Sequence, residues 1–208
     1  MKNLVIIGPP GSGKDTQVDK LRQLFDFNVI SSGDIARVLA EKNEEYRKVV
    51  EAGGLLDDSV LTAELNKELD DIPASTGVVF DGYPRNLHQA ELLGEILLHH
   101  NRILDFVIYL SLDEAAVVER LSSRRVCSVC GHNVSAKAPK CPICGGEPTR
   151  RHDDEPAVII RRDQTFLENT LPLINYYRNK DILLEVNGDQ SIDAVASELK
   201  EKLVYAGK

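Results

Sequence analysis

The chain has 208 residues, of which 42% are hydrophobic and 28% are charged, a composition typical of globular and not of disordered proteins. Its formal net charge of −8 disfavours nucleic acids and anionic membranes as partners, because both would repel it. No apolar run approaches the roughly 20 residues that cross a bilayer, and the four consecutive apolar residues before Gly8 are too few for a secretory signal, so we expect a cytoplasmic protein.

Short apolar segments alternate with segments of helical periodicity along the chain. Strands are predicted at 3–7, 27–30, 77–80, 105–110 and 182–186. Helices are predicted at about 13–24, 34–42, 44–52, 59–70, 86–98, 111–124, 157–177 and 192–204. Ser111 and Glu114 have the spacing of a capping box, and Pro172 is expected to kink or end its helix. Because buried strands that alternate with helices are typical of parallel sheets, we predict an α/β fold with three layers (α/β/α) and a five-stranded parallel sheet.

A glycine-rich segment follows the first predicted strand. Residues 8–16 read GPPGSGKDT, which fits the pattern G-x-x-x-x-G-K between a strand and a helix. Glycines in this pattern let backbone N–H groups turn toward phosphate oxygens, and Lys14 supplies a cation. The segment therefore predicts a P-loop domain that binds nucleotide phosphates. Asp15 stands where Ser or Thr commonly follows the lysine, and we expect its carboxylate to point away from the phosphates or to lie near a hydrated Mg²⁺.

Two more polar segments follow the second and third predicted strands, at the sheet edge where ligands of α/β proteins bind. The first contains Arg37, and the second contains Asp81 and Arg85. Guanidinium groups match phosphate geometry, so the two arginines predict a second phosphate site that needs no metal. Asp81 is a candidate to hold a metal-bound water, and the amide of Gln89 suits a nucleobase.

The four cysteines form two C-x-x-C pairs: Cys127 with Cys130, and Cys141 with Cys144. Each pair is followed by glycine, and this spacing is typical of a structural zinc site in which four thiolates surround one ion. Since four sulfurs suffice, His132 and His152 are expected at the surface. Between 124 and 152 there are six basic residues and one acidic residue, which suits an inserted, zinc-ribbon-like flap that faces a polyphosphate.

Two other classes of protein share parts of this pattern. A phosphate-loop GTPase would read guanine with N-K-x-D, but here Asn179-Lys180 is followed directly by Asp181. A zinc-ribbon protein that binds nucleic acid would need aromatic side chains for base stacking, and aromatic residues make up only 5% of the chain.

Taken together, these segments resemble the nucleoside monophosphate kinases, and most closely the adenylate kinases with a long lid. The resemblance rests on GPPGSGKDTQ at 8–17, SSGDIAR at 31–37, GGLLDDSV at 53–60, VVFDGYPRNLHQA at 78–90, ERLSSRR at 119–125, the four cysteines, and RHDDEPAVIIRR at 151–162. The chain departs from the family where Asp15 replaces the usual glycine, Ser32 the usual threonine and Gly54 the common lysine.

The resemblance implies reversible transfer of the γ-phosphoryl group of ATP to AMP, which gives two ADP and serves adenine nucleotide homeostasis. Kinases of UMP, CMP or another monophosphate remain the alternative. The implied catalytic residues are Lys14, Arg85, Arg124, Arg151 and Arg162. The implied ATP-binding residues are Gly11, Ser12, Gly13, Lys14, Asp15, Thr16, Arg120 and Arg124. The implied AMP-binding residues are Ser32, Arg37, Leu56, Gly82, Arg85, Gln89, Arg151 and Arg162.

The resemblance also implies cofactors and a domain organisation. Mg²⁺ would accompany ATP, with Asp34 and Asp81 orienting its waters, and the cysteines would hold structural Zn²⁺. The core P-loop domain would comprise 1–31, 62–124 and 162–208, with a helical monophosphate-binding (NMP) segment at 32–61 and a zinc-binding lid at 125–161. We expect a monomer whose partners are ATP, AMP and ADP, with no nucleic acid and no membrane.

Overall fold

A five-stranded parallel sheet forms the centre of the molecule, as predicted. The structure is a computed structural model and describes residues 2–135, 137–151 and 154–205. The strands are β1 (Asn3–Ile7), β2 (Phe27–Ser31), β3 (Gly77–Asp81), β4 (Phe106–Ser111) and β8 (Leu183–Asn187). Their order is β2-β3-β1-β4-β8, and each neighbouring pair is parallel. The carboxyl ends of all five strands therefore lie at the same edge of the sheet.

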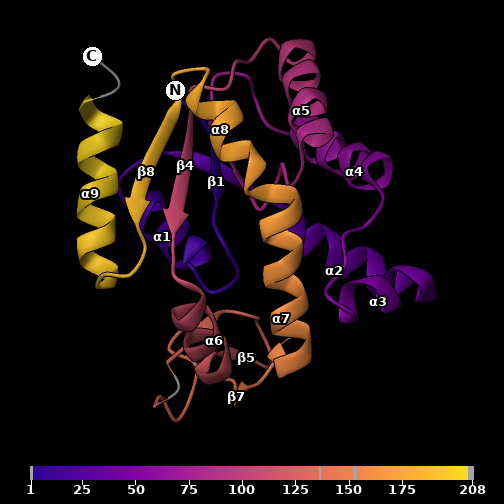
Figure 1. The fold of residues 1–208 in the computed structure, drawn as a ribbon, viewed down its shortest axis with the longest axis vertical. Helices are drawn as coiled ribbons and strands as arrows, with labels where there is room; N and C mark the ends of the chain where they lie inside the picture. Colours follow the sequence, from indigo (N-terminus) through magenta and orange to yellow (C-terminus); the bar gives the residue numbers. More distant parts are fainter. Residues whose placement is uncertain (1, 136, 152–153, 206–208) are drawn as a thin grey trace.

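Side chains of β1 alternate between two hydrophobic clusters, which makes the fold three-layered. Leu4 and Ile6 belong to a cluster that includes α1 (Lys14–Arg22) and α9 (Ile192–Tyr205). Val5 and Ile7 belong to the other cluster, which is covered by helices on the opposite face. Those covering helices are α4 (Asp58–Asp70), α5 (Leu87–His99) and α8 (Pro172–Arg178). Figure 1 shows α9 on one side of β8 and β4, and α8 and α5 on the other.

The helical insert between β2 and β3 has clear start signals. It contains α2 (Ser32–Lys42), α3 (Glu44–Glu51) and α4. Ser31 Oγ accepts a hydrogen bond from the N–H of Asp34, and Asn43 Oδ1 accepts from the N–H of Glu45, so each cap satisfies an N–H that the helix leaves unpaired. The insert projects to one side beyond the sheet (Figure 1).

The predicted capping box at Ser111 is wrong. Helix α6 (Glu114–Ser123) has Asp113 at its N-cap, and Ser111 is the last residue of β4. The parallel pairing of β4 with β8 continues to Ser111, whose Oγ donates to the carbonyl of Val186. Pairing within the sheet therefore places Ser111 in the strand, although the local spacing predicted it as the cap of the helix.

The predicted helix over 157–177 is interrupted. Helix α7 (Pro156–Thr165) passes into a π-helical turn at Phe166–Thr170, and α8 begins at Pro172. Proline at a first helical position lacks only an N–H that would have no intrahelical partner there. The prediction that Pro172 marks a break is confirmed, and the π-helical turn places the start of the irregularity earlier.

Between α6 and α7 lies a second, smaller sheet. Its strands are β5 (Arg125–Cys127), β6 (Asn133–Val134) and β7 (Pro148–Thr149), in the antiparallel order β6-β5-β7. Cys127, Val134 and Cys141 form its small core. In Figure 1 this unit lies with α6 beyond the arrowheads of β4 and β8, which is the edge where ligands of parallel sheets bind. Among the described helices, none is both long and apolar enough to span a membrane.

Candidate functional site

The loop between β1 and α1 has the backbone geometry of a phosphate cradle. Gly11 and Gly13 have φ angles of +78° and +91°, a backbone conformation that is strained in residues with a side chain. A Cβ at Gly8 would lie 2.6 Å from the carbonyl oxygen of Leu110. The amine of Lys14 lies across the loop, donating to the carbonyls of Gly8 at 2.9 Å and Pro9 at 3.2 Å. The loop thus brings together the predicted ATP-binding residues Gly11, Ser12, Gly13, Lys14, Asp15 and Thr16.

Asp81 lies next to this loop because β3 pairs with β1, with Asp81 opposite Ile6. Burial, and after it the charge of Asp15, raise the pKa of the Asp81 carboxyl to about 7, although Lys14 and Arg85 oppose the rise. Burial also lowers the pKa of Lys14, which Asp81 and Asp15 oppose. Two carboxyl groups therefore flank the amine at the sheet edge.

Asp15 faces the small antiparallel sheet. Asn133 Nδ2 donates to Asp15 Oδ2 at 3.2 Å, and one turn along α1 Asp19 Oδ2 lies 4.0 Å from His132 Nδ1. Burial tends to raise the pKa of Asp15, but Lys14, the hydrogen bond from Asn133 and nearby arginines together lower it, so the group is a carboxylate. The side chain of His132 is 36% exposed, and His152 lies outside the described residues.

One buried carboxylate brings two of the predicted catalytic arginines together. Arg124 donates from Nε to Asp154 Oδ2 at 2.8 Å and from Nη2 to Oδ1 at 2.5 Å. Arg162 Nη1 lies 3.5 Å from the same Asp154 Oδ1, and Asp154 is only 2% exposed. Arg151 is close enough to Asp15 to lower its pKa.

Arg120 contacts the loop after β8, donating to the carbonyl of Gly188 at 3.0 Å and to Asp189 Oδ1 at 3.1 Å. This position, one turn before the end of α6, is at the border of the phosphate loop, since the side chain of Leu121 packs near Gly11.

A second group of predicted residues gathers at the end of β3. Ser32 Oγ donates to the carbonyl of Gly82 at 2.6 Å, and Arg85 Nε donates to the same oxygen at 2.8 Å. Gly82 has a φ of +70°, and a Cβ there would lie 2.9 Å from Ser32 Oγ. Burial lowers the pKa of Arg85, Asp81 opposes this, and the nearby charge of Arg37 lowers it further, so the two arginines form one cationic site. Leu56 is buried.

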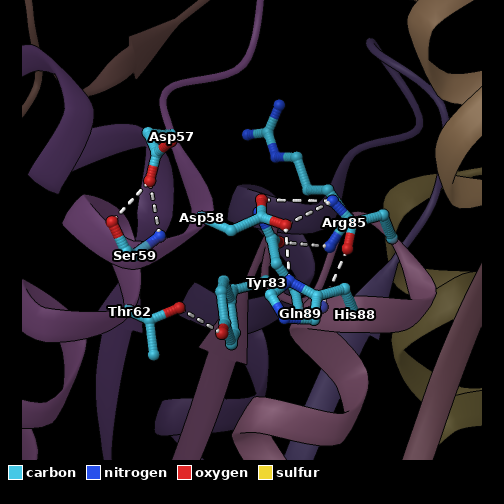
Figure 2. Close-up of polar contacts among 9 residues, drawn as sticks. Asp57, Asp58, Ser59, Thr62, Tyr83, Arg85, His88 and Gln89 are labelled. Atoms are coloured by element: carbon cyan, nitrogen blue, oxygen red, sulfur yellow. Dashed lines mark hydrogen bonds and ion pairs between the residues drawn. The ribbon is translucent and has the colours of Figure 1, made fainter.

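Gln89 is fully buried and both ends of its amide are occupied. Nε2 donates to Asp58 Oδ1 at 2.6 Å, and Oε1 accepts from the N–H of Arg85 at 2.7 Å (Figure 2). Asp34 forms an ion pair with Arg37, whereas the described neighbours of Asp81 are Lys14, Asp15 and Arg85. The structure thus brings Asp81, but not Asp34, to the amine of Lys14.

The helical insert approaches α7 at Gly53. This residue has a φ of +75°, and a Cβ on it would lie 2.8 Å from Arg162 Cγ and 3.2 Å from Val158 Cγ1. The insert and the predicted catalytic Arg162 are therefore in close contact.

The four cysteine sulfurs lie within 4.8 Å of one another. Cys127 Sγ is 3.3 Å from Cys144 Sγ, and Cys130 Sγ is 3.7 Å from Cys141 Sγ. Sulfurs bound to one tetrahedral zinc would be about 3.8 Å apart. Gly131 and Gly145, which follow the two C-x-x-C pairs, have left-handed backbones that turn each pair toward the centre. The cluster could therefore hold a metal ion.

Three residues that the sequence interpretation missed organise the site: Asp58, Asn133 and Asp154. Asp58 and Asp154 lie inside the segments 53–60 and 151–162 that carry the family resemblance. The sequence therefore marks these segments as functional but does not indicate the roles of the two residues. Asn133 has no recognisable signal in the sequence.

Most of the chain matches a known family. Residues 6–182 match the family model described as adenylate kinase. The adenylate kinase of Thermosipho africanus (strain TCF52B) is 38% identical over 207 residues, which span 95% of this chain and 97% of that protein. The adenylate kinase of Limosilactobacillus reuteri subsp. reuteri (strain JCM 1112) is 39% identical over 213 residues, spanning 97% of this chain and 98% of that protein. The adenylate kinase of Caldanaerobacter subterraneus subsp. tengcongensis is 36% identical over 211 residues, with 97% and 96% coverage.

Proposed function

Because this chain belongs to the adenylate kinase family, we propose that it transfers the γ-phosphoryl group of ATP to AMP and so forms two ADP. The observation that carries the proposal is the convergence of Lys14, Asp81 and Arg85 at the carboxyl edge of the sheet. Both sides of the reaction contain the same number of phosphoanhydride bonds, so the equilibrium constant should lie near unity.

The proposed reaction needs alignment and charge neutralisation more than covalent help. An oxygen of the AMP phosphate attacks the γ-phosphorus of ATP, the bond from that phosphorus to the β–γ bridging oxygen breaks, and ADP leaves. The attacking phosphate is already a dianion, so no general base is required. The loop N–H groups and Lys14 would hold the ATP phosphates, while Arg37 and Arg85 would hold the AMP phosphate.

Arg124, Arg151 and Arg162 would stabilise the charge on the group in transfer. In the structure Asp154 forms ion pairs with both Arg124 and Arg162, so nucleotide phosphates would compete with Asp154 for these guanidinium groups. Arg120 would lie against the adenine of ATP.

Asp81 and Asp15 offer the oxygen ligands that Mg²⁺ prefers, either directly or through water. Bound Mg²⁺ would supply charge neutralisation of the ATP phosphates. Asp81 and Asp15 lie at the phosphate loop, whereas Asp34 is paired with Arg37 and is the weaker candidate to orient the waters of the ion.

The cysteine cluster would hold a structural Zn²⁺, since four thiolates leave no open coordination position. Bound zinc would fix the fold of a segment whose core is very small. We propose that this lid, 125–161, closes over ATP, that the NMP segment, 32–61, closes over the monophosphate, and that both exclude water from the reaction.

A coupled ADP-release assay tests this function. Purified protein is given ATP with AMP, CMP, UMP, GMP or dTMP in turn, and we expect turnover with AMP to exceed that with each of the others. Fastest turnover with CMP or UMP would contradict AMP as the substrate and favour a pyrimidine monophosphate kinase. No turnover with any monophosphate, together with salt-dependent capture of RNA, would favour the nucleic-acid class. The monomeric state and the cytoplasmic location remain predictions.

A further inference from the structure

We infer that Asp58 is a positioning residue that fixes the amide of Gln89 in one of its two orientations and thereby makes the monophosphate site select a 6-amino over a 6-keto purine. The inference rests on the proposed function, because it concerns how the AMP site reads its base. Asp58 is the first residue of α4, and it contacts the start of α5 (Figure 2).

Asp58 accepts hydrogen bonds from three side chains at the start of α5. Gln89 Nε2 donates to Oδ1 at 2.6 Å, Asn86 Nδ2 lies 3.1 Å from each carboxylate oxygen, and His88 Nδ1 lies 3.0 Å from Oδ2. The positive end of the α5 dipole also favours a negative charge here. Although partial burial tends to raise the pKa of Asp58, the hydrogen bonds from His88, Gln89 and Asn86 lower it. Asp58 is therefore an ionised group that can only accept.

The orientation of the Gln89 amide follows from its two partners. The carboxylate of Asp58 requires the NH₂ end, and the N–H of Arg85 requires the oxygen end, which it meets at 2.7 Å. A flipped amide would place an oxygen against a carboxylate and an NH₂ group against an N–H. Asn86 Oδ1 also accepts from the backbone N–H of Gln89 at 2.8 Å, so the main chain beneath the amide is fixed as well.

A fixed amide has consequences for base recognition. A glutamine that can flip presents either a donor or an acceptor at a given point, and so accepts both patterns. With one N–H given to Asp58 and one lone pair given to Arg85, Gln89 keeps one N–H and one lone pair in fixed places. Adenine presents an amino donor beside a ring-nitrogen acceptor, whereas hypoxanthine presents a keto acceptor beside a ring N–H. Only one of these patterns matches a fixed amide.

Asp58→Asn tests the inference. The substitution keeps the size of the side chain, but an amide can both donate and accept, so it no longer requires the NH₂ end of Gln89 to face it. The measurement is the ratio of kcat/KM for AMP to that for IMP, its 6-keto isostere. IMP is measured as a competitive inhibitor of AMP where its turnover is too slow. Both constants come from the same sample, so the ratio does not depend on how much of the variant is folded. We expect the ratio to fall roughly tenfold, mainly through KM, with the KM for ATP unchanged.

Two further variants separate positioning from a structural role. Asp57→Asn is the matched control, since Asp57 caps the same helix through Ser59 and has no contact with Gln89 among those described, and it should leave the AMP to IMP ratio unchanged. In a Gln89→Ala background, Asp58→Asn should no longer change the ratio, because the group through which it acts is gone.

The outcomes are distinct. An unchanged AMP to IMP ratio in Asp58→Asn, with AMP turnover by the wild type intact, would overturn the inference alone. A change of equal size in the Gln89→Ala background would also overturn it. Absence of AMP turnover by the wild-type protein would instead overturn the proposed function.

Discussion

Asp15 places a carboxylate directly after Lys14, where the phosphates of ATP are expected to bind. We predict that Asp15→Asn binds Mg²⁺-free ATP about three- to tenfold more tightly, because one negative charge facing a polyanion is removed. The hydrogen bond with Asn133 can be retained by the amide oxygen of the variant. Titration calorimetry in a buffer free of Mg²⁺ and of chelator measures the change. Asp19→Asn, one turn further along α1, is the control that should bind ATP like the wild type, and equal affinities of all three proteins would contradict the prediction.

The raised pKa of Asp81 predicts a pH dependence of stability. Burial gives this carboxyl a pKa of about 7 in the folded protein, against about 3.9 in an unfolded chain, so the folded state binds the extra proton between these values. Stability should therefore fall as the pH rises from about 4 to 7, by up to about 4 kcal/mol. Asp81→Asn removes this loss.

Thermal unfolding at several pH values checks this prediction. The Tm of Asp81→Asn relative to the wild type should rise between pH 5 and pH 8. The same substitution at the exposed Asp26 should shift the curve by little at either pH. A Tm difference for Asp81→Asn that does not vary with pH would show that ionisation of Asp81 does not destabilise the fold.

Single residues differ in how well the sequence predicts them. Lys14 and Arg85 belong to short segments whose spacing carries their chemistry, so their positions could be predicted. Asp58 and Asp154 act on residues about 30 positions away, Gln89 and Arg124, through contacts that exist only after the sheet has assembled. In the sequence, these two aspartates cannot be distinguished from aspartates at the surface.

At the level of elements, the central strands were predictable because each is a short apolar run between loops, and the observed bounds differ from the predicted ones by at most one residue. The cap of α6 was not, since pairing of β4 with β8 outweighs the local signal at Ser111. Strands β5 to β7 have only two or three residues each, too few for any periodicity, so only the cysteine spacing indicated a folded unit there.

The cysteine unit gives a prediction about metal removal. We expect one Zn²⁺ per chain by atomic absorption, and chelation should lower both the Tm and kcat while far-UV circular dichroism shows that the core helices remain. The reason is that zinc binding contributes on the order of 10 kcal/mol to small modules of this kind, whereas the core has its own hydrophobic clusters. Cys130→Ser should reproduce the loss, and Ser128→Ala should not. Full activity and an unchanged Tm in metal-free protein would contradict a structural role.

At the scale of the whole molecule, the candidate site residues lie at the carboxyl edge of the sheet, whereas contacts that stabilise the fold lie at the opposite edge. Near the amino ends of β1 and β3, the buried Arg102 donates to Asn3 Oδ1 and to the carbonyl oxygens of Ile72, Pro73 and Thr76. These contacts join the end of the helical insert to the central strand. Arg102 could not be told from a surface arginine in the sequence, because the backbone carbonyls that it binds have no side-chain signature.

We predict that Arg102→Lys lowers the free energy of unfolding by about 2–3 kcal/mol, because an ammonium group cannot replace the forked donors and leaves buried carbonyls unpaired. Chemical denaturation measures this, and kcat at low temperature should change little. Arg47→Lys, the same substitution at an exposed residue of α3, is the matched control and should stay within about 0.5 kcal/mol of the wild type. Equal stability of both variants would show that the hydrogen bonds of Arg102 do not stabilise the fold.

The absence of a side chain at Gly53 sets how closely the helical insert and α7 approach each other, because the backbone of the insert lies against the aliphatic stem of Arg162. Even a methyl group there would act as a wedge. Under the proposed function, each nucleotide could then still bind, but the gap between donor and acceptor would stay open to water. Hydrolysis of ATP would then compete with phosphoryl transfer.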